Sequence, residues 1–129
     1  MSKAEQAKQY FLEGYNCCQA VVLPFCEELG VSKETALIFA SGFGGGMGGL
    51  QEICGAVSGM TMVANLKGGY TDPKASEEKQ AHYKKIRELA EIFEKKRESI
   101  ICRTLKSGKD RNFCADLVYD AAAILEKEF

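Results

Sequence analysis

The chain has 129 residues, 46% of them hydrophobic, so one domain with a real hydrophobic core is expected over residues 1–129. Its 17 basic residues are nearly balanced by 18 acidic ones, which argues against nucleic acid as a partner, because nucleic-acid binders usually carry a basic excess. The residues after Met1 are polar, and no uncharged stretch reaches the roughly 20 residues of a bilayer span, so we expect a cytoplasmic protein without a membrane helix.

Apolar residues at helical spacing predict a first helix over residues 2–13. Asn16 is a good N-cap for a second helix over 17–29, and Ser32 is one for a third helix over 33–41. Both side chains can accept a hydrogen bond from the free backbone N–H groups of a first helical turn.

The segment 42–49 is rich in glycine and cannot hold a regular helix, because glycine loses much backbone entropy there. An uncharged helix is predicted over 52–66, a long charged helix over 73–101 and a last helix over 113–127. No segment alternates apolar and polar residues with period two. The predicted fold is therefore all-α, a single-domain bundle of about six helices with a Gly-rich loop.

Cysteines are the residues best able to carry chemistry in this chain. They are Cys17, Cys18, Cys26, Cys54, Cys102 and Cys114. Without an export signal, thiols, metal ligands or redox-cycling pairs are more expected than structural disulfides. Cys17, Cys54 and Cys114 stand at predicted helix starts. Cys102 stands near the end of the long helix, beside Arg103. Each of these places favours the thiolate, which is both the nucleophile and the metal ligand.

The cysteine spacing by itself assigns no known site. A buried cysteine can simply be a small hydrophobic residue, which is the expected role of Cys26. The chain has no C-x-x-C motif, which excludes a zinc ribbon and a thioredoxin motif, and no C-x-x-C-H, so no haem is expected. The single histidine, His82, is expected to be structural, because it shares a helix face with apolar residues.

The glycines allow two interpretations. Residues 44–49 match G-x-G-x-x-G, but a dinucleotide site needs a preceding strand and a following acid, which are absent. The loop is instead expected to pass close to another helix or to the site around Cys54, with Gly44, Gly45 and Gly46 bordering that site. Gly55 and Gly59 form a G-x-x-x-G pattern on the next helix, which predicts a close helix contact.

Three ordered motifs and two single cysteines resemble the C_GCAxxG_C_C family of putative redox-active proteins. The motifs are GYNCCQA (14–20), ASGFGGGMG (40–48) and EICGAVSG (52–59), and the single cysteines are Cys102 and Cys114. The resemblance implies a helical domain similar to that of split-Soret cytochrome c, without its haem. It also implies that the cysteines are redox-active.

Three functions stay open at this point. The four cysteines at the family positions are Cys17, Cys54, Cys102 and Cys114. They can converge as thiolate ligands of an iron–sulfur cluster or of zinc. They can instead be catalytic thiols of thiol–disulfide exchange, one attacking and another resolving. In the alternative, they only pack, and the chain is a non-catalytic binding or assembly module. The expected partner is an electron-transfer or thiol partner of unknown identity, and association into homo-oligomers and enzymatic activity are left open.

Overall fold

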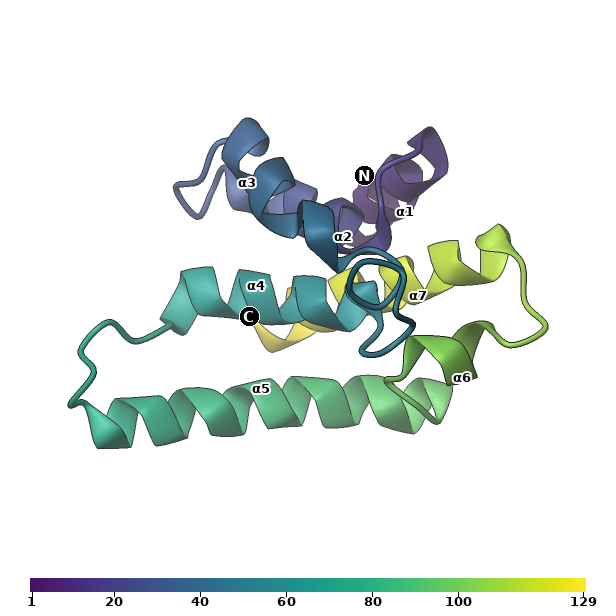
Figure 1. The fold of residues 1–129 in the computed structure, drawn as a ribbon. Helices are drawn as coiled ribbons and strands as arrows, with labels where there is room; N and C mark the ends of the chain where they lie inside the picture. The colour runs from purple at the N-terminus through teal and green to yellow at the C-terminus, as the bar shows by residue number, and fades with distance from the viewer.

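The computed structural model describes residues 1–129 as seven α-helices joined by loops (Figure 1). The helices are α1 (Lys3–Glu13), α2 (Cys17–Cys26), α3 (Lys33–Ala40), α4 (Gly55–Gly68), α5 (Ser76–Arg97), α6 (Cys102–Lys106) and α7 (Arg111–Glu128). A short 3₁₀ turn, η1 (Ser41–Phe43), follows α3. The predicted all-α class is confirmed, and α6 is the helix beyond the expected six. No helix combines the length and the hydropathy that crossing a membrane requires.

Helix α2 forms the centre of the fold, because apolar residues surround most of its circumference. It packs against α1, α3, α4 and α7. Its Val21 and Val22 are buried together with Met60 of α4 and Val118 of α7. Helix α5 lies along α4 at the lower edge of Figure 1 and buries only Leu89 and Phe93. Two of the helices that carry the functional site, α4 and α7, therefore pack on α2 in one common core.

The predicted N-caps explain how the early helices begin. Asn16 forms a capping box with Gln19, in which each side chain accepts from the other residue's backbone N–H. Ser32 accepts from the backbone N–H of Thr35 and caps α3 as predicted. Asn16 also donates through Nδ2 to the carbonyl of Ser41, at 3.0 Å. The start of α2 is thereby joined to the segment that leads into the Gly-rich loop.

The long helix is shorter than the predicted range 73–101. Asp72 accepts from the backbone N–H of Lys74 in a local turn, and α5 begins only at Ser76. The helix ends at Arg97, and the capping residue Glu98 adopts a left-handed conformation with φ 71°. The prediction that Cys102 lies near the end of this helix is wrong, because the chain turns at Glu98 and Cys102 begins α6.

A buried carboxylate joins α5 to α7. The side chain of Asp120 is only 5% exposed. Arg97 Nε donates to Asp120 Oδ2 at 2.5 Å, and Lys96 Nζ lies 3.2 Å from Oδ1. A buried charge is tolerated when it is paired in this way, so these contacts hold the last turn of α5 in place.

The Gly-rich loop is a left-handed turn. The five consecutive residues 45–49 all have φ between 59° and 79°. Only glycine enters this region without a steric penalty, and Met47 is the single residue among the five with a side chain. The backbone closes on itself, since Gly48 N–H donates to the carbonyl of Gly42 and Gln51 N–H to that of Gly45. The turn is the small ring beside the first turn of α4 in Figure 1.

Candidate functional site

A cavity of about 400 Å³ is lined by four of the six cysteines. Cys17 comes from the start of α2, Cys54 from the residue before α4, Cys102 from the start of α6 and Cys114 from the first turns of α7. These are the four cysteines that sequence reasoning placed in one site. The structure thus brings together residues far apart in the chain, while their chemical role stays a prediction.

Two of the thiols are placed by a short backbone bridge. Ile53 and Ile101 form an isolated antiparallel β-bridge. On either side of it, the N–H groups of Cys54 and Cys102 donate across to the opposite segment, at 2.8 and 2.6 Å. The bridge therefore holds the residue before α4 and the first residue of α6 on neighbouring segments, and it brings both thiols to the same cavity.

Cys17 is placed by the close approach of α2 and α4. A Cβ built on Gly55 would lie 2.2 Å from Cys17 Sγ, so the sulfur occupies the space that a side chain at position 55 would need. One turn later, a Cβ on Gly59 would lie 2.8 Å from Val21 Cβ. Both glycines therefore face α2, and the predicted close helix contact is confirmed.

The Gly-rich loop borders the same cavity. Gly45 is one of its lining residues. A Cβ on Gly46 would lie 2.8 Å from Cys102 Cβ, and one on Gly44 would lie 2.8 Å from Asn16 Cβ. Of the three glycines expected at the site, one lines it and the other two pack against its walls.

Burial raises the pKa of the thiols of Cys54, Cys102 and Cys114, that of Cys54 to about 12. We expected helix starts and a neighbouring arginine to lower these pKa values. That expectation is wrong, because the net shift of all three pKa values is upward. Backbone N–H groups at the start of α4 and the charges of Lys106 and Arg103 do act in that direction. Loss of hydration outweighs them, because burial penalises the charged thiolate.

Cys17 interacts electrostatically with the three other cavity cysteines and with Cys18. A thiolate at Cys17 raises the pKa of Cys18, Cys54, Cys102 and Cys114. Coulomb interactions weaken with distance, so Cys17 lies within electrostatic reach of all four. Cys17 and Cys114 are partly exposed, whereas Cys54 and Cys102 are only 5% and 8% exposed. The cavity thus has two accessible thiols and two deeper ones.

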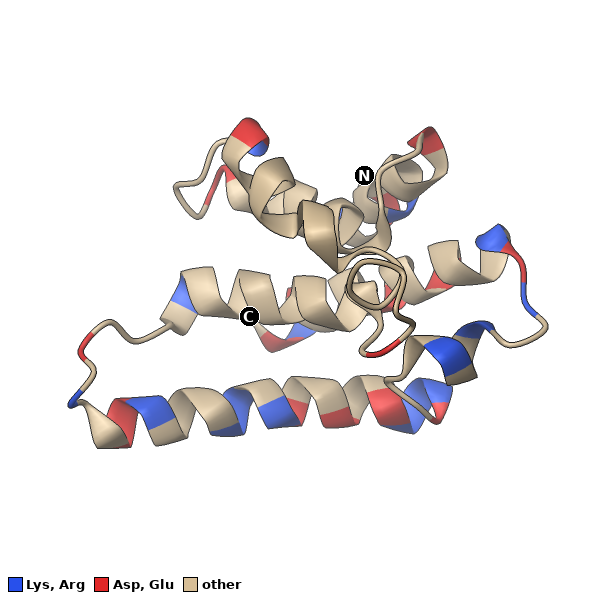
Figure 2. Ribbon diagram, in the orientation of Figure 1, with Lys and Arg blue, Asp and Glu red and all other residues tan.

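One wall of the cavity is basic. It includes Lys106, Lys109 and Arg111, with Asp110 as the only acidic residue of the lining. The carboxylate of Asp110 accepts a hydrogen bond from the first turn of α7, at 3.2 Å, and caps that helix. Figure 2 shows charged residues at the end of α6, on the connecting loop and at the start of α7. Sequence reasoning missed this wall, because it interpreted the segment only as a loop.

All six cysteines are free thiols. No three Cys, His, Asp or Glu side chains are grouped closely enough to hold one metal ion. A tetrahedral zinc site needs sulfur atoms about 2.3 Å from the metal, so the four cavity cysteines would have to move together to form one. The present arrangement does not fit zinc without such a movement.

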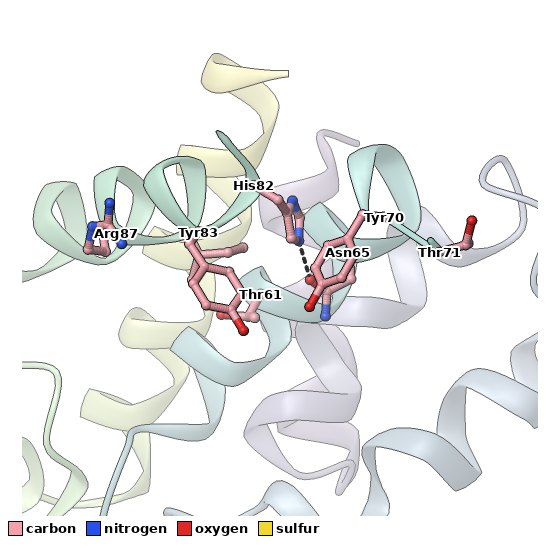
Figure 3. Close-up of a pocket in the computed structure, with 9 residues that line it drawn as sticks. Thr61, Asn65, Tyr70, Thr71, His82, Tyr83 and Arg87 are labelled. Carbon is pink, nitrogen blue, oxygen red and sulfur yellow. Dashed lines mark hydrogen bonds between the residues drawn. The ribbon is translucent and has the colours of Figure 1, made fainter. Parts of the chain in front are cut away.

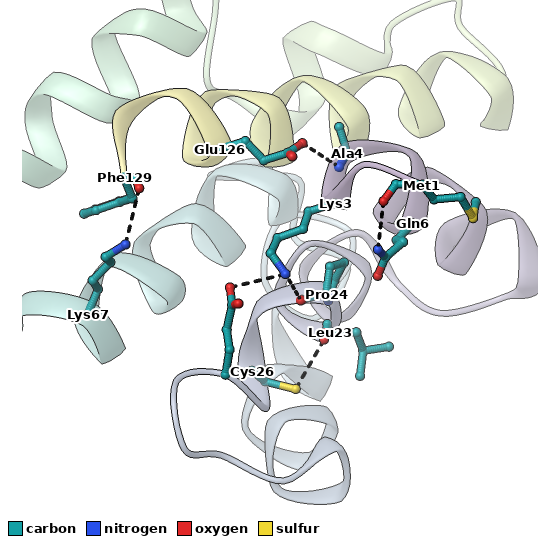
Figure 4. Close-up of polar contacts among 11 residues, drawn as sticks. Met1, Lys3, Ala4, Gln6, Leu23, Pro24, Cys26, Lys67, Glu126 and Phe129 are labelled. Carbon is teal, nitrogen blue, oxygen red and sulfur yellow. Dashed lines mark hydrogen bonds and ion pairs between the residues drawn. The ribbon is translucent and has the colours of Figure 1, made fainter.

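The two remaining cysteines lie outside the cavity, buried in α2. Cys18 Sγ contacts Met62 Sδ at 3.5 Å, and burial raises its pKa to about 12. Cys26 Sγ donates to the carbonyl of Leu23 at 3.3 Å, near the opposite end of α2 (Figure 4). Cys26 is thus the small buried hydrophobic residue that the sequence predicted.

A second, wider hollow of about 760 Å³ lies between α4 and α5 (Figure 3). It contains His82, whose Nε2 lies 2.6 Å from Asn65 Oδ1. Tyr70 and Tyr83 stand beside it in edge-to-face contact. No cysteine lines this hollow. His82 therefore joins two helices at a distance from the thiols.

The chain also matches a known protein family. The model of the family described as "Putative redox-active protein (C_GCAxxG_C_C)" matches residues 15–128. The matched range includes the Gly-rich loop and all four cavity cysteines. No curated protein and no solved structure matches the chain.

Proposed function

Because the chain belongs to the C_GCAxxG_C_C family of putative redox-active proteins, we propose that it carries out thiol–disulfide exchange at its cysteine cavity. The observation that carries the proposal is that four cysteines from four separate segments line one cavity. Cysteines that only fill space have no reason to converge around an opening. Exchange needs one accessible thiol and a second one nearby, and the cavity provides both.

Cys17 is the proposed attacking thiol. It is partly exposed, and it is the common electrostatic neighbour of the other cavity cysteines. Cys54 is the proposed resolving thiol, because it precedes Gly55, which contacts Cys17 Sγ, and because it is buried from competing partners. A Cys54–Cys102 pair is less suited to attack, since both residues are buried from an external disulfide.

The electrons balance in two steps. The Cys17 thiolate attacks one sulfur of the partner's disulfide, the partner's S–S bond breaks, and one partner sulfur leaves as a thiolate. Cys54 then gives its proton to that leaving thiolate and attacks Cys17 Sγ. The protein disulfide forms and the second partner sulfur leaves. Two electrons have passed from the protein thiols to the partner.

The test is a thiol count with disulfide mapping. The reduced protein is oxidised with a small disulfide, and loss of two thiols with a Cys17–Cys54 linkage is expected. Cys17→Ala should abolish this linkage, whereas the matched variant Cys26→Ala should retain it, and circular dichroism checks that both fold. Six free thiols after prolonged oxidation, or a linkage that includes Cys26, would overturn the proposal.

A second candidate is an iron–sulfur cluster, favoured by the number of cavity cysteines, since such clusters take four thiolate ligands. A cluster distributes its ligands over several iron atoms, so it tolerates a wider spacing of sulfur atoms than zinc. Iron and sulfide analysis with a visible spectrum on protein prepared without oxygen decides between the two. If the protein contains stoichiometric iron and sulfide, and Cys17→Ala loses both, the function is that of an iron–sulfur protein and not thiol exchange.

A further inference from the structure

Access to the thiols limits the size of the partner. Two of the four cavity sulfurs belong to residues that are less than a tenth exposed, and the other two are only partly exposed. A folded protein could reach no further than the opening. The cavity volume of about 400 Å³ is that of a small-molecule site, and its wall is partly apolar, with Leu105 and Leu117. The geometry therefore favours a small molecule.

The cations of the basic wall form no ion pair within the protein, although Lys109 Nζ lies 5.3 Å from the ring centroid of Phe113. The four ion pairs of the chain involve neither Lys106, Lys109 nor Arg111. Arg111 is held in position by Phe11, because its Nη2 donates to the Phe11 carbonyl and its guanidinium lies 4.1 Å from the ring centroid. Asp110, the only acid of the lining, is engaged at the start of α7. Three cations thus face the cavity without an acidic partner.

We infer that the partner of the thiol site is a small disulfide carrying carboxylates, which Lys106, Lys109 and Arg111 bind through these groups. The inference rests on the proposed thiol–disulfide exchange and specifies its substrate class. Carboxylates suit these residues, because arginine and lysine form their strongest hydrogen bonds with anionic oxygens. Bound in this way, the disulfide bond is held in the cavity within reach of Cys17.

The test compares three disulfides that differ in charge. They are 3,3′-dithiodipropionate with two carboxylates, the neutral bis(2-hydroxyethyl) disulfide, and cystamine with two ammonium groups. Each rate with the reduced protein is divided by the rate of the same disulfide with 2-mercaptoethanol, which removes intrinsic differences in reactivity. At low salt the normalised rate should be at least about tenfold higher for the anionic disulfide than for cystamine, and the difference should shrink at high salt.

Variants of the wall separate recognition from thiol activation. Lys106→Gln/Lys109→Gln also changes the pKa of nearby thiols, but that effect is common to all three disulfides and cancels in their ratio. The ratio of anionic to neutral rate should fall severalfold in this variant, in which Arg111 is the one remaining cation of the wall. The matched control Lys84→Gln/Lys95→Gln, with the same loss of charge on the exposed face of α5, should keep the parental ratio.

The outcomes distinguish this inference from the function on which it rests. Similar normalised rates for all three disulfides, or a ratio that Lys106→Gln/Lys109→Gln leaves unchanged, would overturn the substrate class and leave thiol exchange standing. Absence of reaction with every disulfide would overturn thiol exchange and the inference together.

Discussion

The sulfur of Cys17 stands 2.2 Å from the position that a Cβ on Gly55 would take. The second helix of the site can approach the first only because residue 55 has no side chain. The thiol at the centre of the cavity is therefore positioned by the absence of a methyl group on its neighbour.

Gly55→Ala is expected to displace the Cys17 side chain and to destabilise the fold by about 1–3 kcal/mol, the usual effect of overpacking. Urea unfolding measures the stability, and mass-resolved alkylation measures the reactivity of Cys17. Gly68→Ala is the control, because Gly68 ends the same helix and its added Cβ meets nothing within 4 Å. Equal stability of the two variants would contradict the close contact.

Gly46→Ala should be more harmful than Gly48→Ala. Both residues have positive φ, so both variants incur a left-handed strain of about 1–2 kcal/mol. Only at Gly46 would the added Cβ also meet backbone, with Glu52 N at 2.6 Å, and Cys102 Cβ at 2.8 Å. Thermal unfolding of the pair isolates the steric part. Altered alkylation of Cys102 in Gly46→Ala alone would show that the loop shapes the cavity.

The pKa of Cys54, raised from 9.0 to about 12 by burial, makes two pH predictions. Alkylation of Cys54 in the folded protein should be slower than that of a free thiol at pH 8 and should rise about tenfold per pH unit. The pKa of Cys54 is higher in the folded protein than in the unfolded chain. The contribution of the buried neutral thiol to the free energy of unfolding is therefore complete below pH 9 and is lost as pH rises towards 12. Cys54→Ala should reduce this loss of stability at high pH only in part, because burial raises the pKa of Cys18 in the same way. A flat stability profile above pH 9 would contradict the burial effect.

His82→Gln should leave the redox chemistry unchanged. The histidine contacts Asn65 in a hollow that contains no cysteine, so its loss affects only the contact between α4 and α5 (Figure 3). The number of thiols oxidised per cycle and the oxidation rate should equal those of the parent chain. A large loss of either would connect His82 to the thiols.

Asp120→Asn should lower the free energy of unfolding by about 2 kcal/mol, because a buried acceptor of charge-assisted hydrogen bonds from two cations loses its charge. Asp116→Asn on the same helix removes a carboxylate whose side chain is 49% exposed and pairs with Lys8 at the surface. That variant should change stability by less than about 1 kcal/mol. Urea unfolding of the two variants, fitted with one common m-value, compares their free energies of unfolding.

Sequence periodicity was sufficient to predict the longer helices, because each of them has an apolar face that must be buried. Asn16 and Ser32 were recognisable as N-caps, because a capping side chain binds a backbone N–H group only three residues further along the chain. The Ile53–Ile101 bridge was not, since one isolated pair carries no alternating pattern. Helix α6 is too short for periodicity to detect, and it begins directly after the predicted long helix over 73–101.

The convergence of the cysteines was predicted from the family resemblance and from the place of three of them at predicted helix starts. Spacing did not contribute, since it connects no two of them. Their acidity could not be judged from helix position either. At Cys54 the helix start and the burial act in opposite directions, and only the three-dimensional structure shows that burial is the larger effect.

The distance in sequence between Cys17 and Cys54 has a thermodynamic consequence. Linking them would close a ring of roughly 40 residues, which removes about 4 kcal/mol of chain entropy from the unfolded state. The folded chain already holds these segments side by side and loses no such entropy. By the closure of a thermodynamic cycle, folding favours oxidation of this pair by the same amount, so the oxidised protein is expected to unfold at higher urea concentration than the reduced one.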